Sequence, residues 1–253
     1  MRAIELNGVK PDLNKDAFNW GRIVVHDRKA VEKAAQLPVN TVHTLQEMID
    51  RRAAFLTDYQ DVKWATAYRT AVAAVRDAEQ RTLGTDGALT KAAAKGLFKL
   101  MSYKDEYEVA RLHSDTGFYE SLQARFEGDF KIKHHLAPPL IPTGRDGRGR
   151  PYKRAFGPWM QTAFRQLRKM KRLRGTRWDV FGYTNERRME RALISEYQML
   201  LERLCAGLTR ENHDEAVRIA GLVTGIRGYG PVKEQAVTQV RADIATALVD
   251  AGL

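Results

Sequence analysis

A basic, turn-rich stretch spans residues 130–191 and reads FKIKHHLAPPLIPTGRDGRGRPYKRAFGPWMQTAFRQLRKMKRLRGTRWDVFGYTNERRMER. Fourteen of the 42 Lys and Arg residues of the chain, but one of its 31 acidic residues, lie between Lys131 and Arg177. This window therefore carries +13, and the remaining 28 basic and 30 acidic residues carry −2. The net positive charge of the chain is therefore concentrated in this stretch, which makes it the candidate surface for an anionic partner.

The first part of the stretch predicts a β-hairpin. Between Phe130 and Leu136, apolar residues and His134 alternate with Lys or His, which is the period of two expected of a half-buried strand. Residues 152–156 predict the returning strand, and the loop between the two is rich in Pro and Gly. We therefore expect strands at about 130–136 and 152–156.

The second part predicts a helix with a charged outer side. Gly157 and Pro158 suit the start of this helix, because proline at the first helical position loses no hydrogen bond. Its expected inner stripe consists of Met160, Phe164, Leu167 and Met170. The basic residues of the hairpin and helix form the predicted docking or anion-binding surface, here called the basic face, which comprises Arg150, Lys153, Arg154, Arg165, Arg168, Lys169 and Arg172.

The chain on either side of this stretch is helical in pattern. Residues 44–81 predict two helices with a break near Thr57, and the second has apolar residues at a spacing of three and four from Tyr68 to Ala78. Thr184 is expected to cap a long helix, and further helices follow toward the C-terminus. The fold class is mainly α, a multi-helix domain over residues 44–253 with one inserted β-hairpin.

Residues 1–43 form a separate N-terminal piece in this interpretation. Ile4 and Leu6 alternate with charged or polar residues before Asn7 and Gly8, which predicts a short edge strand followed by a turn. A helical pattern then begins at Asn14. The N-terminal piece is therefore expected to be a strand followed by helices.

The composition is that of a soluble globular protein. The chain of 253 residues is 43% apolar and 29% charged, with a mean hydropathy of −0.47. It contains no run of about 18 to 20 apolar residues, which a membrane helix would need. Residues 1–10 lack the apolar core of a signal peptide. We therefore expect a cytoplasmic protein without a membrane partner.

Cys205 is the only cysteine. A single cysteine excludes an intrachain disulfide, and it excludes an iron–sulfur cluster or zinc site held by thiolates of this chain alone. Cys205 lies in YQMLLERLCAGL, on the apolar side of a predicted helix. We interpret it as a buried structural thiol and not as a nucleophile.

Two other motifs invite a ligand hypothesis. His134 and His135 are adjacent in a predicted strand, so they point to opposite faces and cannot chelate one metal ion together; we predict no metal site. The segment GIRGYGPVKE is a candidate anion loop through Gly225, Gly228 and Gly230, whose backbone N–H groups could cradle an anion. A helix end followed by a turn is the favoured interpretation of these glycines.

The sequence predicts no catalytic residue. Asp105, Glu106 and Glu108 lie close to Lys104 and Arg111, a pattern more typical of a solvated or interdomain ion-pair surface than of an acid/base pair. No G-x-S-x-G motif and no other arrangement of nucleophile and base is present. An independent enzyme is therefore disfavoured.

Aromatic residues are interleaved with the basic ones. Tyr152, Phe156, Trp159 and Trp178 lie among the Arg and Lys side chains, and this composition permits binding of single-stranded RNA. Each aromatic residue also fits a position that faces a core. An acidic protein surface or the phosphates of a coenzyme suits the basic residues equally well, and nucleic acid is the less favoured partner.

Several long motifs point to a family. FNWGRIVVHD, LFKLMSYKDEYEVARL, FEGDFKIKHHLAPP, KRAFGPW, LRGTRWDVFGYTNERRMERALISEY and IRGYGPVKE, in this order, are similar to the C-terminal region of the fused, single-chain bacterial indolepyruvate ferredoxin oxidoreductases. These enzymes belong to the 2-oxoacid:ferredoxin oxidoreductase superfamily. The resemblance covers nearly the whole chain.

The resemblance implies an accessory role. In that family the thiamine diphosphate and iron–sulfur parts lie upstream, followed by a gamma-type domain, whose end residues 1–43 resemble. The family's reaction is the oxidative decarboxylation of a 2-oxoacid, with coenzyme A acylated and electrons passed to ferredoxin. This chain lacks the thiamine diphosphate motif, so we expect no cofactor in it and no catalytic residue.

The expected function is that of a structural or accessory domain, or a split subunit, of an indolepyruvate (2-oxoacid):ferredoxin oxidoreductase. Its expected partners are the thiamine-dependent and gamma-type domains, and its basic face would serve ferredoxin, coenzyme A or intersubunit docking. A truncated remnant of the fused enzyme is consistent with the same motifs. The alternative from another class is a free-standing, basic RNA-binding module.

Overall fold

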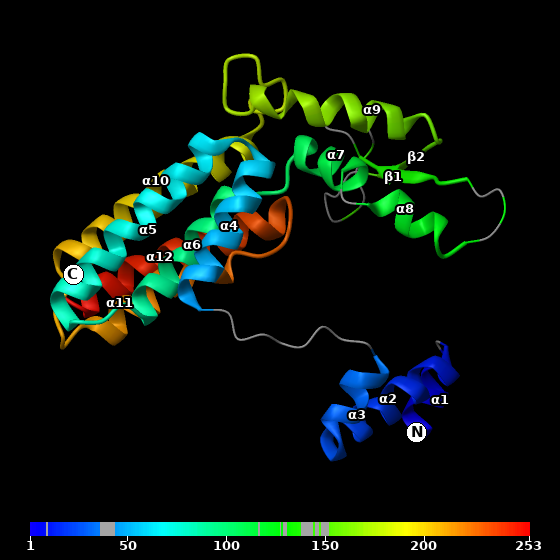
Figure 1. Cartoon of the computed structure of the whole chain (residues 1–253), viewed down its shortest axis with the longest axis horizontal. Coiled ribbons are helices and arrows are strands. Elements are labelled where there is room, and N and C mark those ends of the chain that lie inside the picture. The colour runs from blue at the N-terminus through cyan, green and yellow to red at the C-terminus, as the bar shows by residue number, and fades with distance from the viewer. Residues whose placement is uncertain are drawn as a thin grey trace. The chain divides into compact units, whose positions relative to one another are not determined.

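The computed structural model describes residues 1–8, 10–35, 44–115, 117–126, 128, 131–137, 144, 147 and 152–253. Figure 1 shows the elements in chain order. Contacts within the chain divide it into two compact units, residues 1–44 and residues 45–253. Among the described helices, none combines the length and the apolar character needed to cross a bilayer.

The N-terminal unit consists of the helices α1 (Arg2–Asn7), α2 (Pro11–His26) and α3 (Arg28–Ala34). The predicted edge strand near Ile4 is wrong, because α1 occupies these residues and is tied to α2 by an ion pair of 2.7 Å between Glu5 and Lys15. Two alternating apolar residues are too few to distinguish a strand from a short helix. None of the three helices contains a buried residue.

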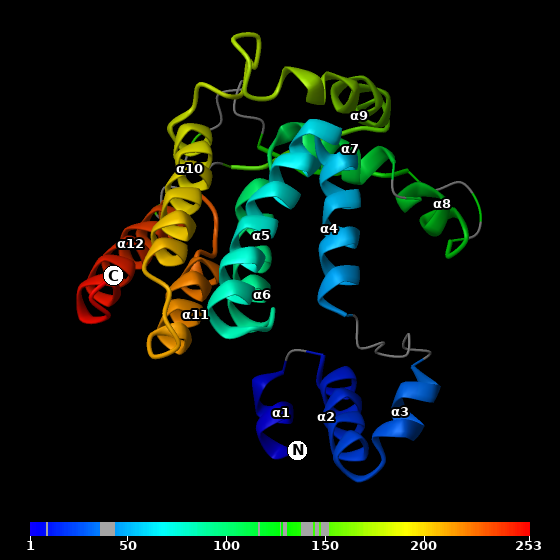
Figure 2. The ribbon, with the colours of Figure 1, turned by 60° about the vertical axis from the view of Figure 1, so that its left-hand side comes forward.

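The larger unit has a bundle of helices as its main part. Its elements are α4 (Leu45–Tyr59), α5 (Val62–Leu83), α6 (Ala88–Met101), α10 (Asn185–Ala206), α11 (His213–Gly221), the 3-10 helix η2 (Leu222–Gly225) and α12 (Pro231–Asp250). Figures 1 and 2 show these helices gathered side by side. Helix α6 is central, since it packs against α4, α5, α10 and α11.

The core of the bundle follows the apolar periodicity of the sequence. Tyr68, Val72 and Val75 of α5 are buried, as their spacing predicts. Gly96 lets α6 approach α10 closely, because a Cβ atom at this position would overlap the ring of Tyr197. The close approach is possible only with glycine, and the buried hydroxyl of Tyr197 donates a hydrogen bond of 2.8 Å to the carbonyl of Ala220.

A second group of elements surrounds a smaller hydrophobic cluster. It comprises α7 (Glu106–Ser114), α8 (Phe118–Gln123), β1 (His134–Leu136), β2 (Arg154–Phe156), α9 (Met160–Leu167) and the 3-10 helix η1 (Arg168–Leu173). Ala110, Met160 and Phe164 form the centre of the cluster, and Leu136 and Phe156 of the hairpin pack against it. Figure 1 shows the hairpin beside α7 and α9.

The hairpin is antiparallel, with His134 opposite Phe156 and Leu136 opposite Arg154. Its strands are shorter than the predicted 130–136 and 152–156, and Phe130 lies outside the described residues. His134 is buried and His135 exposed, which is the predicted alternation. The fold class is confirmed: the described residues are mainly α-helical, with one two-stranded hairpin inserted between helices.

Two expectations for side chains of this region are wrong. Met170 is exposed and not part of an inner stripe, because the helix tightens to a 3-10 helix at Arg168 and the period changes from 3.6 to 3.0 residues. Tyr152, Trp159 and Trp178 are also exposed, Trp159 at 61% and Trp178 at 65%. These aromatic residues lie just outside the helices and strands, where no neighbouring element covers them.

Candidate functional site

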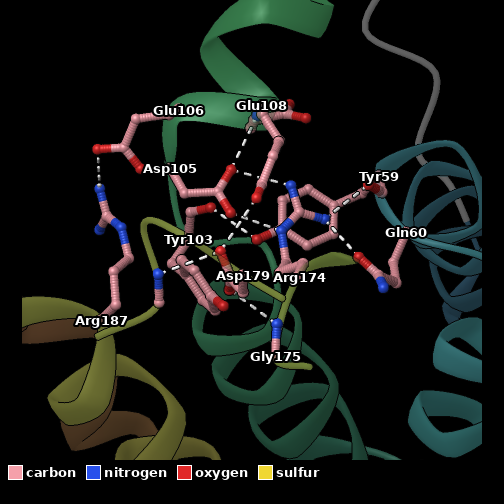
Figure 3. A network of polar contacts seen from close by, with 12 residues as sticks. Tyr59, Gln60, Tyr103, Asp105, Glu106, Glu108, Arg174, Gly175, Asp179 and Arg187 are labelled. Atoms are coloured by element: carbon pink, nitrogen blue, oxygen red, sulfur yellow. Dashed lines mark hydrogen bonds and ion pairs between the residues drawn. The ribbon is translucent and has the colours of Figure 1, made fainter. Parts of the chain in front are cut away.

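A buried ionic network joins α7 to the segment between η1 and α10 (Figure 3). Asp105 precedes α7 and caps it, because its carboxylate accepts the backbone N–H of Glu108 at 2.8 Å. The same carboxylate receives two hydrogen bonds of 2.5 and 2.9 Å from the guanidinium of Arg174. Asp105 is 2% exposed, so this pair is closed to solvent.

Arg174 also holds the end of α4. Its guanidinium donates to the carbonyl of Tyr59 at 2.8 Å and to Oε1 of Gln60 at 2.7 Å, and it lies 3.8 Å from the centre of the Tyr59 ring. Burial opposes the positive charge, but the hydrogen bonds with Asp105 and the charges of its neighbours together outweigh burial and raise the pKa of Arg174. Arg174 therefore stays charged and links three segments of the chain.

The turn after Arg174 is closed by Asp179. Its carboxylate accepts the backbone N–H of Gly175 at 2.8 Å and that of Gly182 at 3.1 Å. It also accepts the hydroxyl of Tyr107 at 3.1 Å, which ties the turn to α7. Burial, followed by the charge of Asp179, raises the pKa of Tyr107, so the phenol remains a donor.

Arg187 extends the network to α10. It donates to the Glu190 carboxylate at 2.5 Å and lies 3.4 Å from Glu106. Glu190 is also paired with Lys233 at the start of α12. Burial raises the pKa of Glu106, although the charge of Arg187 opposes the shift.

The acidic residues before and in α7 are therefore not a solvated surface, which corrects one expectation from the sequence. Asp105 is 2% and Glu108 4% exposed, and Glu108 makes two hydrogen bonds of 2.8 Å with Arg111. An ion-pair role fits these contacts, because the carboxylates of Asp105 and Glu108 are each held by an arginine.

Another buried carboxylate, that of Glu79 in α5, lies outside this network and holds the start of α6. The residue before α6 is Gly87, which has no side chain with which to cap the helix. Glu79 takes that role, because it accepts the backbone N–H groups of Gly87, Leu89 and Thr90 at 2.9 to 3.0 Å. It also accepts the Thr90 hydroxyl at 2.5 Å and contacts His213 of α11 at 2.9 Å.

The pKa of Glu79 reflects these contacts. Burial alone would raise it, but the hydrogen bonds from Thr90, His213 and the backbone lower the pKa to about 2. Sequence reasoning missed this residue, because a glutamate eight residues before a glycine carries no pattern that marks it as a cap.

The residues of the basic face come from three neighbouring elements. Lys153 precedes β2 and Arg154 begins it; both are exposed. Arg165 of α9 and Lys169 and Arg172 of η1 are exposed too, at a spacing of four and three that places them along one side. Arg168 is half-buried and forms an ion pair with Asp115. Arg150 lies outside the described residues.

The glycines of the candidate anion loop end one helix and begin another. Gly225 ends η2, and Gly230 precedes α12. Gly228 has a φ of +95°, which is the left-handed region that favours glycine. A cavity of about 310 Å³ is lined by Gly228 but not by the other two glycines.

Two histidines distant in sequence meet beside the hairpin. The rings of His113 and His134 lie 5.3 Å apart, and Nε2 of His134 is 3.1 Å from the Tyr119 hydroxyl. Burial lowers the pKa of both histidines, and the charges of His134 and Lys104 lower the pKa of His113 further. Among the described residues, no three His, Cys, Asp or Glu side chains are close enough to hold a metal ion.

Cys205 is half-buried in α10, and burial raises the pKa of its thiol. A raised pKa disfavours the thiolate, which is the reactive form. This environment suits a structural thiol.

Comparison with protein families gives one match. Residues 45–246 match DUF6537, which is described as a family of unknown function. The match lies within the larger unit and includes the ionic network, Glu79 and the basic face. Comparisons with curated proteins and with solved structures gave no match.

Proposed function

The chain belongs to the DUF6537 family, whose function is unknown. We propose that it is an accessory helical domain or split subunit of an indolepyruvate (2-oxoacid):ferredoxin oxidoreductase. The motif resemblance described above is the starting point of the proposal. In this role the chain supports the thiamine-dependent decarboxylation to acyl coenzyme A, which other domains of the complex carry out.

The exposed apolar side chains of the N-terminal unit are the main structural support for this proposal. Its three helices contain no buried residue, yet they carry large apolar side chains. Phe18, Trp20 and Val25 of α2 are exposed, Val25 at 89%. Phe18 and Val25 are seven residues apart and therefore lie on one side of α2, and an exposed apolar side of a helix is commonly covered by a partner. Because residues 1–43 resemble the end of the gamma-type domain, we assign the covering surface to that domain of the complex.

The ionic network supports an accessory rather than a catalytic role. Asp105 belongs to the motif LFKLMSYKDEYEVARL, and Arg174 and Arg187 belong to LRGTRWDVFGYTNERRMER. These motifs carry much of the family resemblance, and their charged residues bind one another. Motifs of this kind mark a shared structure, so the resemblance is compatible with a domain that has no chemistry of its own.

The cofactors of the proposed complex do not fit this chain. An iron–sulfur cluster takes four cysteine ligands, and the chain has one half-buried cysteine. The sequence also lacks the thiamine diphosphate motif of that family. We therefore place both cofactors in the other domains and derive no step through them here.

The basic face provides a surface for docking. Lys153, Arg154, Arg165, Lys169 and Arg172 are exposed. Exposed cations attract an acidic partner such as ferredoxin, or the phosphates of coenzyme A, and this attraction weakens as salt is added. The proposed contact with the gamma-type domain is apolar, so salt should not weaken it in the same way.

Co-purification tests the proposed function. We expect the tagged chain, expressed in its native host, to recover a thiamine-dependent partner that mass spectrometry identifies. The variant Phe18→Asp/Val25→Asp is expected to lose this partner, because it places charges in the apolar contact. Lys29→Ala, which changes an exposed residue of α3, serves as the control and should retain it.

Recovery of no thiamine-dependent protein by the unaltered chain would rule out the accessory role. Equal recovery of the partner by Phe18→Asp/Val25→Asp would instead show that the N-terminal unit does not form the contact.

A second candidate function, binding of single-stranded RNA, is favoured by the exposed aromatic residues. Trp159 and Trp178 lie open to solvent among cations, and the guanidinium of Arg177 is 5.2 Å from the Trp178 ring. If this function holds, Trp159→Ala/Trp178→Ala should reduce the affinity for an RNA oligonucleotide by tenfold or more, on the order of 1–3 kcal/mol per stacked base. Trp20→Ala, at an exposed tryptophan of the other unit, is the control; equal affinity in all three proteins excludes this function.

A further inference from the structure

A cavity of about 310 Å³ lies where the end of α6 faces the loop before α12. One wall comes from Lys99 and the residues that follow α6, and another from one side of α10. The segment from Ile226 to Tyr229 and the first turn of α12 complete it. A cavity of this size is at the small end of the range for ligand pockets, which suits a small molecule.

Four cations line this cavity: Lys99, Lys104, Arg227 and Lys233. Glu190 is the one acidic residue among the lining residues, and its charge is already engaged. It accepts a hydrogen bond of 2.5 Å from Arg187 and pairs with Lys233. The cavity therefore has a surplus of positive charge.

The surplus cations lack acidic partners. Within the part of the chain that the structure describes, neither Lys104 nor Arg227 forms an ion pair, and the ammonium of Lys99 donates to the carbonyl of Thr224 at 2.5 Å. Burial and then the charges of Arg227 and Lys233 lower the pKa of Lys99. Like charges gathered at a half-buried site repel one another, and a bound anion would reverse this repulsion.

The backbone at the cavity offers further donors. Helix α12 has no side-chain cap and begins with Pro231, which has no N–H, so the N–H groups of Val232 and Lys233 are the donors of its first turn without a partner among the described side chains. The N–H groups of Gly228 and Tyr229 also make no hydrogen bond to a described residue. A side chain at Gly228 would crowd Val232, because a Cβ atom there would lie 2.7 Å from Val232 Cγ1. The loop is thus shaped around an open backbone at the start of a helix, where anions are favoured.

We propose that this cavity binds a small molecule through a phosphate or diphosphate group. Phosphate oxygens carry the negative charge that would pair with the lysines, and the guanidinium of Arg227 offers the paired donors that bind such oxygens. The exposed ring of Tyr229 lines the cavity as well and provides a surface for the rest of the ligand. This site does not depend on the accessory role proposed above.

The cavity includes one residue of the candidate anion loop that the sequence suggested. The glycine pattern pointed to Gly225, Gly228 and Gly230, and of these Gly228 lines the cavity. The cations come from the end of α6 and from both sides of the glycine turn, which no local motif brings together. The same loop can therefore end one helix with a turn and also contribute to an anion site.

Isothermal titration calorimetry of the full chain with inorganic phosphate and with pyrophosphate tests the proposal at constant ionic strength. We expect saturable binding at one site. Tighter binding of pyrophosphate would indicate that the site holds two phosphate groups, and tighter binding of phosphate would indicate one. Lys104→Gln/Arg227→Gln is expected to weaken this binding by about tenfold or more, because two charge-assisted contacts are lost. Both side chains are exposed, so the circular dichroism spectrum should not change.

Lys91→Gln/Lys95→Gln is the matched control, since it removes two exposed lysines from α6 that do not line the cavity. This variant should bind the probes as the unaltered chain does. Equal weakening in both variants would show a general effect of net charge and overturn the site. The absence of saturable binding of either probe below about 1 mM, a free energy of about −4 kcal/mol, would overturn it as well.

Discussion

Replacement of Glu79 by glutamine is expected to lower the free energy of unfolding by about 3 kcal/mol. The pKa of Glu79 is about 2 in the folded chain and ordinarily 4.5, and each unit of difference corresponds to about 1.4 kcal/mol. Glutamine keeps one acceptor oxygen, but it has no charge for the N–H groups of Gly87, Leu89 and Thr90. Chemical denaturation of the variant and the unaltered chain measures the difference.

The pH dependence of stability gives the same prediction a second test. Because the folded-state pKa lies below the ordinary value, the contribution of the Glu79 carboxylate is complete above pH 4.5 and is lost as the pH falls toward 2. Glu79→Gln should remove this part of the acid dependence. Glu202→Gln, at an exposed position of α10, is the control and should change stability by less than about 0.5 kcal/mol. Equal losses in the two variants would contradict the capping role of Glu79.

Arg174→Met is expected to cost about 3–5 kcal/mol of stability. The substitution leaves the carboxylate of Asp105 buried without its partner, and removing one partner of a buried ion pair has costs of this order. It also removes the donor to the Tyr59 carbonyl, so the end of α4 loses its link to α7. Thermal or chemical unfolding of the purified variant measures the loss.

A second substitution separates the ion pair from simple packing. Arg174→Met/Asp105→Asn should recover part of the lost stability, because asparagine has no charge to leave unpaired and can still cap α7. Arg172→Met, two residues away and exposed, should have little effect. If Asp105→Asn makes the Arg174→Met variant less stable still, the cost does not arise from an unpaired charge.

Much of the bundle could be predicted from the sequence. The buried stripe of Tyr68, Val72 and Val75 follows directly from apolar residues at a spacing of three and four, and Thr184 caps α10 as its position before the helix suggests. The hairpin was predictable from the alternation around His134. These elements share one property, which is that neighbouring residues alone determine them.

The sites could not be predicted, because they join residues that are distant in sequence. Asp105 and Arg174 are 69 residues apart, and His213 reaches Glu79 across 134 residues. Charged pairs of this kind have no periodicity, so the acidic residues near α7 resembled an exposed surface. The exposure of Trp159 and Trp178 was missed for a related reason, since a position just outside a helix or strand has no pattern that shows whether another element covers it.

The accessory role is tested most directly by the reduction of ferredoxin by a 2-oxoacid and coenzyme A. The measurement compares the isolated chain, the partner complex purified with the chain, and the same complex after the chain has been removed and then added back. We predict no reduction by the isolated chain, a lower rate when the chain is absent, and recovery of the rate when it is restored. Reduction by the isolated chain, or a rate and assembly that do not change when the chain is removed, would contradict the role.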